Sequence, residues 1–199
     1  MNALANIATG FGLSTAAGLN AYLPLLIVAL LARFTHLIVL KPPYDVLSSG
    51  WAIGVLLVLL TIEVFVDKIP AVDTVNDGIQ TFIRPVAGAV LFAAGTRAVD
   101  LHPAIALACG LLLAGGVHAA KASARPIVTA SSGGLLNPVV SVAEDFLSAI
   151  TSIVAIVFPL AVVFFVLFLA ILFIVWYRKR RTPKSVKREE KPGGGLSER

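Results

Sequence analysis

The chain has 199 residues, of which 58% are hydrophobic and 14% charged, and its formal net charge is +5. A soluble domain is closer to half apolar and a quarter charged, so this composition excludes an ordinary soluble protein. Long apolar runs without sustained alternation favour membrane-spanning helices over a membrane barrel. We therefore expect an all-α fold, a polytopic helical membrane bundle of about five or six spans.

The positive charge is concentrated at the C-terminal end. Residues 178–199 hold nine Lys or Arg and three Glu, whereas residues 1–177 hold seven basic and eight acidic side chains. The near-neutral body argues against a nucleic-acid partner, and the basic end is typical of an anchor for anionic lipid. We predict a membrane domain over 1–180 and a disordered tail over 181–199, which is cytoplasmic because positive segments stay inside.

The first apolar segment, residues 3–18, is too short for a span. A helix rises ~1.5 Å per residue, so a ~30 Å hydrocarbon core needs about 20 residues. A second apolar piece follows, with Pro24 in its first turn, where proline is tolerated, and it ends near Arg33. We expect Asn20 to cap this second helix at a break. A leader cleaved near Ala21 is the alternative, although no basic residue precedes Arg33.

Residues 50–66 form the clearest predicted span after a loop interrupted by two prolines. Gly50 and Gly54 are spaced to offer a close-packing helix face. Glu63 lies inside the span, and Asp67 is one turn further on the same face. Acidic groups within an apolar segment are costly, so this pair marks a candidate polar site.

An amphipathic helix is predicted next, over residues 71–82, and a short segment rich in Ala and Gly begins at Pro85. Residues 104–116 form a further span. Its small residues let backbones approach, so we place it at the centre of the bundle. The polar stripe of the amphipathic helix comprises Asp73, Asp77, Gln80 and Arg84.

His118, Lys121 and Arg125 follow at spacings of three and four, which puts them on one helical face. Glu144 and Asp145 lie near the start of the next predicted helix. The 32 residues from 146 to 177 exceed one span and contain a proline at 159, so we predict one long helix kinked there, or two helices.

Two short runs match one another without a gap. Residues 14–20 read STAAGLN and residues 131–137 read SSGGLLN, and an Arg-Pro pair occurs at 84–85 and again at 125–126. Secondary transporters are often built from two related halves whose broken helices meet at the midplane. We interpret the match as an internal repeat with broken or re-entrant helices at Asn20 and Asn137.

Charged side chains at the bilayer centre cost roughly 2.5–3.5 kcal/mol each on insertion scales. One interpretation is a substrate- or ion-binding site near the midplane, and the other is a structural salt-bridge network or charges in the headgroup region. We predict the site. Its candidate residues are Asn20, Glu63, Asp67, Arg84, His118, Lys121, Arg125, Asn137, Glu144 and Asp145.

Four motifs resemble those of a bacterial membrane family catalogued as a domain of unknown function, DUF4126, over roughly residues 5–160. The resemblance implies an integral membrane protein, and it assigns no activity and no catalytic residue. The motifs are Gly18-Leu-Asn-Ala-Tyr-Leu-Pro24, Asp67-Lys-Ile-Pro70, Ile83-Arg-Pro-Val86, and Leu136-Asn-Pro-Val-Val-Ser141 with Glu144-Asp145.

The expected function is a small transporter or permease for an ion or a small solute, an anionic solute among the candidates. The alternative is a lipid-binding or membrane-assembly protein that does not transport, and a homo-oligomer is left open. No nucleophile–base set or known catalytic motif occurs, so we expect no enzyme, cofactor or metal site. The single cysteine, Cys109, cannot form a disulfide within one chain.

Overall fold

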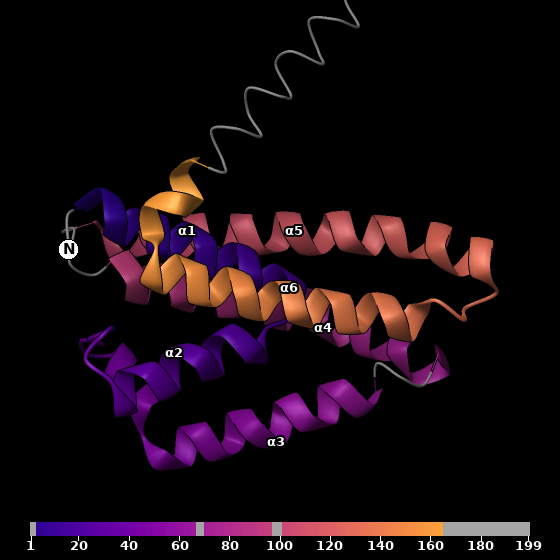
Figure 1. Cartoon of the computed structure of the whole chain (residues 1–199), viewed down its shortest axis with the longest axis horizontal. Helices are drawn as coiled ribbons and strands as arrows, with labels where there is room; N and C mark the ends of the chain where they lie inside the picture. Colours follow the sequence, from indigo (N-terminus) through magenta and orange to yellow (C-terminus); the bar gives the residue numbers. More distant parts are fainter. Residues whose placement is uncertain (1–2, 67–69, 97–100, 165–199) are drawn as a thin grey trace, which may run out of the picture. The chain divides into compact units, whose positions relative to one another are not determined.

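Helices make up the secondary structure throughout the described chain. The structure is a computed structural model and describes residues 3–66, 70–96 and 101–164, with the backbone alone for 70–75. Within these ranges the predicted all-α class is confirmed. In chain order the elements are α1 (Ala3–Leu19), α2 (Tyr22–Phe34), the 3-10 helix η1 (Tyr44–Ser48), α3 (Gly50–Val66), α4 (Pro70–Thr96), α5 (Pro103–Ser132) and α6 (Asn137–Val157) (Figure 1).

Three helices are long and apolar enough to cross a membrane: residues 76–96 of α4, and the whole of α5 and α6. The helices α1, α2 and α3 are apolar but shorter. Large apolar side chains are exposed on the outer faces, among them Trp51, Leu112 and Phe146. By length and composition the chain is therefore a membrane protein whose outer faces suit contact with lipid.

The bundle packs around α1. Eleven of its 17 residues are buried, and it contacts α4, α5 and α6. Because small residues allow backbones to approach closely, three glycines on different faces of α1 hold these contacts. They are Gly10 against Gly95 on α4, Gly12 against Ala155 on α6, and Gly18 against Val117 on α5.

The prediction that residues 104–116 lie at the centre of the bundle is wrong. Only 22% of the most apolar 18-residue stretch of α5 is buried, and Leu111 and Leu112 are exposed. The small residues that do pack, Gly110 and Ala114, share one face. One such face is sufficient for a helix at the side of the bundle, whereas α1 has small residues on several faces.

The predicted boundary at Pro85 is absent, because α4 is continuous through this proline, and α5 is likewise continuous through Pro126. A proline inside a helix removes one hydrogen bond and costs about 3 kcal/mol. Beyond Pro85 the helix is anchored by the burial of Ala87, Leu91 and Phe92. This packing against neighbouring helices outweighs the local cost, so the charged stripe and the small-residue stretch belong to one helix.

The helices α2 and α3 run side by side along one edge of the described bundle (Figure 1). The predicted close-packing face of α3 is wrong for the described residues. A Cβ atom on Gly54 would meet nothing within 4 Å, and one on Gly50 would meet only the Arg33 guanidinium. Contacts between α3 and the rest of the bundle are consequently sparse.

Both expected interruptions of the helices lie where the sequence places them. The first falls between Leu19 and Tyr22, beside Asn20. The second falls between Ser132 and Asn137, where Gly133 and Gly134 have φ angles of 60° and 86° that favour glycine. The internal repeat and the re-entrant character of these helices stay predictions.

The last described helix is interrupted one residue before the predicted kink. The helix α6 ends at Val157, the backbone of Phe158 leaves the helical region, and helical residues resume over 159–164. The remainder of the predicted long segment and the tail over 181–199 lie outside the described residues.

Gly110→Ala should destabilise the bundle, because a methyl group there would meet the Gly88 carbonyl oxygen and the side chain of Phe92. Overpacking against backbone atoms costs about 1–3 kcal/mol. Gly116→Ala is the matched control on the same helix, since nothing lies within 4 Å of a Cβ at that position. Thermal unfolding in detergent micelles should show a lower Tm for the first variant only, and equal Tm values would contradict the close packing of α4 and α5.

Candidate functional site

Charged side chains gather where α4 and α5 face one another. The two helices run antiparallel, so Asp77 lies opposite Arg125 while Arg84, two turns along α4, lies opposite His118. Arg125 Nη1 donates to Asp77 Oδ2 at 2.5 Å, and Arg84 Nη1 lies 3.2 Å from His118 Nδ1. Both helices carry their polar groups seven residues apart, which places each set on one face.

The tautomer of His118 follows from its neighbours. A guanidinium only donates hydrogen bonds, so Nδ1 facing Arg84 must accept and the proton of a neutral ring lies on Nε2. Nε2 lies 3.0 Å from Thr81 Oγ1, which itself donates to the Asp77 carbonyl oxygen at 2.8 Å. Arg84, His118, Thr81 and the Asp77 carbonyl group therefore form a continuous chain of hydrogen bonds.

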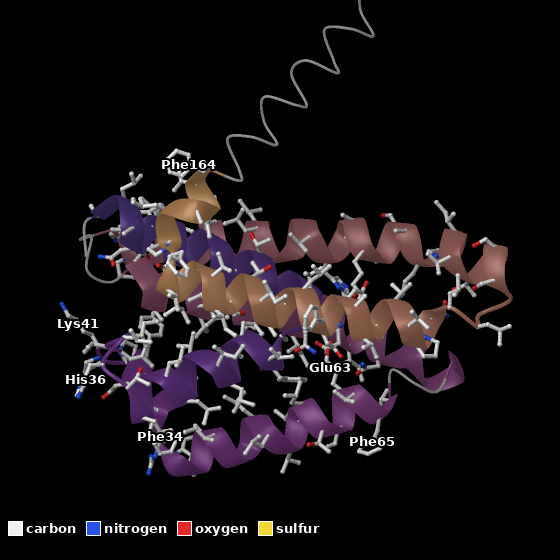
Figure 2. All side chains as sticks on the ribbon, viewed as in Figure 1. Phe34, His36, Lys41, Glu63, Phe65 and Phe164 are labelled. Carbon is white, nitrogen blue, oxygen red and sulfur yellow. The ribbon has the colours of Figure 1, made fainter. Side chains whose placement is uncertain are left out.

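Glu63 extends this cluster to α3. Figure 2 shows its side chain pointing from α3 toward the other helices, whereas Phe65 points away. Glu63 Oε1 lies 3.2 Å from Arg84 Nη2, and both side chains are 1% exposed. The pair joins the sparsely packed α3 to the bundle through an enclosed ion pair.

On the other side the cluster reaches α6. Arg125 Nη2 donates to Ser141 Oγ at 2.9 Å and lies 3.7 Å from Glu144 Oε2. Lys121 Nζ approaches the same Glu144 oxygen at 2.7 Å. One carboxylate of α6 is therefore shared by two cations of α5.

The break between α1 and α2 is bonded to the same cluster. Lys121 Nζ donates to the Leu19 carbonyl oxygen at 3.3 Å. Asn20 Oδ1 accepts from the backbone N–H groups of Tyr22 and Leu23 at 3.0 and 2.9 Å, so the prediction that Asn20 caps the second helix is confirmed. Asn20 Nδ2 donates to Asp145 Oδ1 at 2.9 Å.

Eight of the ten predicted site residues thus belong to one polar network, which we call the charge network. Asn137 is buried, but its Oδ1 accepts from Thr129 within the turn between α5 and α6. Asp67 lies outside the described residues. The eight are Asn20, Glu63, Arg84, His118, Lys121, Arg125, Glu144 and Asp145.

Sequence reasoning left three contributors out of the candidate list. Asp77 belongs to the predicted polar stripe but not to the candidate list, and it pairs with Arg125. Its two-turn spacing from Arg84 on a continuous helix is the signal that identifies it. Thr81 and Ser141 carried no such signal, since single hydroxyl residues are common in membrane helices.

Charge in the network is closely balanced. The cations Arg84, Lys121 and Arg125 form ion pairs with the carboxylates of Glu63, Asp77 and Glu144. The fourth carboxylate, Asp145, accepts a hydrogen bond from Asn20. Mutual neutralisation offsets much of the cost of placing charges in an apolar bundle.

On α4, three buried polar atoms make no hydrogen bond to the described residues: Asp77 Oδ1, Gln80 Oε1 and Arg84 Nε. An unsatisfied buried group costs roughly 1–3 kcal/mol. All three lie on α4 within two turns, so this face of the helix has capacity for further polar contacts.

Neither the three cavities below nor a cluster of metal ligands adds a second candidate binding site in the described part of the chain. Three surface cavities, of about 470, 390 and 750 Å³, are lined by residues outside the charge network. Among the described residues, no group of three or more His, Cys, Asp or Glu side chains is placed to hold a metal ion. The network is the feature of the bundle that has the chemistry of a binding site.

Comparison with known proteins gives one match. A family model described as a domain of unknown function (DUF4126) matches residues 7–179, a range that contains the whole charge network. No curated protein and no solved structure matches the chain.

The two asparagines should differ in their effect on stability. Asn20→Ala removes three hydrogen bonds at the break and should lower the free energy of unfolding by about 2–3 kcal/mol. Asn137→Ala removes the bond from Thr129 and should cost about 1 kcal/mol. Unfolding of the two variants in micelles checks this order, and an equal loss would show that the asparagines have equivalent structural roles.

Arg84→Met should destabilise strongly, because it leaves the carboxylate of Glu63 buried without its guanidinium. Breaking a buried pair costs about 3–5 kcal/mol. The double variant with Glu63→Gln should lose less than the sum of the single losses. Arg33→Met, on an exposed arginine of α2, is the matched control and should cost under about 1 kcal/mol. Additive losses in this double-mutant cycle would exclude a direct coupling between Glu63 and Arg84.

Proposed function

The chain belongs to the DUF4126 family, and on that premise we propose that it is a small permease for an ion or a small solute. The observation that carries the proposal is the charge network, which links α3, α4, α5, α6 and the break between α1 and α2 in one enclosed set of contacts. A polar path through an otherwise apolar bundle is what an ion or polar solute requires.

Energetic reasoning favours function over stability for this network. Buried ion pairs are weak contributors to stability, because desolvation offsets most of the Coulomb attraction and apolar residues of similar volume often serve as well. Ionisable groups within membrane segments characteristically mark ion pathways and proton relays. The unsatisfied Asp77 and Arg84 atoms add capacity to bind a water, ion or solute group.

The geometry also gives the network continuity. From Glu63 through Arg84, His118 and Thr81 to the Asp77 carbonyl, successive polar atoms lie within 3.2 Å. The side chain of Asp77 then leads to Arg125. Such a sequence of polar groups suits contact with a partly dehydrated ion or a polar solute.

The alternative, a lipid-binding or membrane-assembly protein, has less support. A lipid-binding protein would need the stripe of His118, Lys121 and Arg125 to face anionic headgroups, but all three side chains are buried. Lys121 and Arg125 are paired with carboxylates of the bundle. This alternative then depends on the basic segment 178–199, which lies outside the described residues.

We place the protein in a bacterial inner membrane with its C-terminus in the cytoplasm. The support is the cluster Arg178-Lys-Arg-Arg181 directly after an aromatic pair, which follows the bias of basic residues toward the inner side. We propose no catalytic role for any residue, and we propose the lipid bilayer as a partner, as well as the ion or small solute.

Ion flux should depend on the charge network. Purified protein is reconstituted into proteoliposomes, and movement of protons, Na⁺, K⁺, chloride and phosphate is followed separately. Glu63→Gln, Glu144→Gln and Arg125→Gln should each reduce the transported flux about tenfold or more, equivalent to about 1.4 kcal/mol in the barrier. Asp45→Asn, on exposed η1, is the control and should retain the wild-type rate.

Flux that is unchanged in all three network variants would contradict the proposal, as would the absence of flux for every ion tested. Native mass spectrometry supplies the opposing outcome. Bound anionic lipid that is lost on substitution of Lys121 and Arg125 would favour the lipid-binding alternative.

A further inference from the structure

The C-terminal end of α1 lies inside the charge network, where a lysine ammonium group covers it. The last carbonyl groups of a helix have no partner within the helix and carry partial negative charge. Lys121 Nζ donates to the Leu19 carbonyl oxygen at 3.3 Å. The helix end is therefore closed by a cation that comes from α5.

The same ammonium group is held by a full negative charge. Glu144 Oε2 of α6 lies 2.7 Å from Lys121 Nζ, and the Lys121 side chain is 4% exposed. A backbone carbonyl and a carboxylate, from two different helices, thus converge on one enclosed positive charge. Carbonyl groups at interrupted helix ends, together with a carboxylate, are oxygen ligands of the kind that hold monovalent cations in membrane bundles.

The other charged groups near Glu144 do not replace the Lys121 ammonium group as its close partner. Arg125 also lies near Glu144, but its Nη2 is 3.7 Å from Oε2 and donates to Ser141, while its Nη1 donates to Asp77. Asp145, the neighbouring carboxylate of α6, bonds to Asn20 at the start of α2. Without the lysine, Glu144 would keep only its 3.7 Å contact with Arg125, and the Leu19 carbonyl would lose the ammonium group that donates to it.

We propose that the end of α1 is a binding site for a small monovalent cation and that Lys121 fills this site with its own ammonium group. The ligand class is Na⁺, K⁺ or a small primary ammonium ion. The inference deepens the proposed function, on which its meaning for permeation rests, by naming the class of ion. Binding at the site follows from the contacts alone and is tested without any flux.

The experiment empties the site by Lys121→Ala, which removes the ammonium group and leaves the Glu144 carboxylate and the Leu19 carbonyl. Thermal unfolding of the full chain is measured in micelles with chloride salts of Na⁺, K⁺, ethylammonium or N-methylglucamine at equal ionic strength. The three small cations should raise the Tm of this variant by about 3 °C or more over N-methylglucamine, because they bind the folded state. The wild type should melt at one temperature in all four salts.

Two further variants separate cation binding from loss of packing. Lys121→Met keeps the chain volume in the site, so its Tm should be independent of the cation. Lys121→Ala combined with Glu144→Gln removes the carboxylate, and it should lose the cation response of the single variant. A cation response that persists in this double variant would overturn the assignment of Glu144 as a ligand.

The proposal is overturned if Lys121→Ala melts at the same temperature in all four salts. The proposal is also overturned if the variant yields the same amount of folded protein in all four salts, or none in any of them. A small cation should restore the missing charge and so increase that yield. A cation response without ion flux would support the site and contradict the permease. Flux in the wild type without a cation response in Lys121→Ala would support the permease and contradict the cation site.

Discussion

Every cation buried in this bundle takes its counter-charge from a different helix. Arg84 of α4 pairs with Glu63 of α3, Arg125 of α5 with Asp77 of α4, and Lys121 of α5 with Glu144 of α6. Removal of a single partner leaves an uncompensated charge in an apolar surrounding, which is far more costly than removal of the pair. The helices therefore hold one another in register through electrostatics as well as through packing.

Close packing of small residues sets the distances on which these pairs depend. Gly88 and Gly110 bring the backbones of α4 and α5 together, and Gly18 brings α1 against α5. Lys121 lies four residues, about one helical turn, beyond Gly18's neighbour Val117, so the approach of α1 also brings the Leu19 carbonyl to the ammonium group. The polar contacts and the glycine contacts are consequently parts of one arrangement.

Local signals in the sequence were reliable where one residue controls the backbone. Asn20 was expected to cap the second helix, and its side chain accepts hydrogen bonds from the first two N–H groups of α2. The span predicted over residues 50–66 matches α3. The local rule failed at Pro85, because packing of the following residues Ala87, Leu91 and Phe92 against other helices outweighs the proline penalty. A second local rule failed at Gly54, because a close-packing motif needs a partner helix that the sequence does not name.

Composition and periodicity alone determined the helical membrane class, the polar stripes on α4 and α5, and the two interruptions of the chain. These depend on transfer energies and on helix geometry, which are properties of each segment by itself. Only the tertiary structure decided which stripe meets which, because pairing depends on the relative depth and rotation of helices that are far apart in sequence. It thereby brought Asp77 into the charge network, paired Asn137 with Thr129, and set Lys121 against the end of α1.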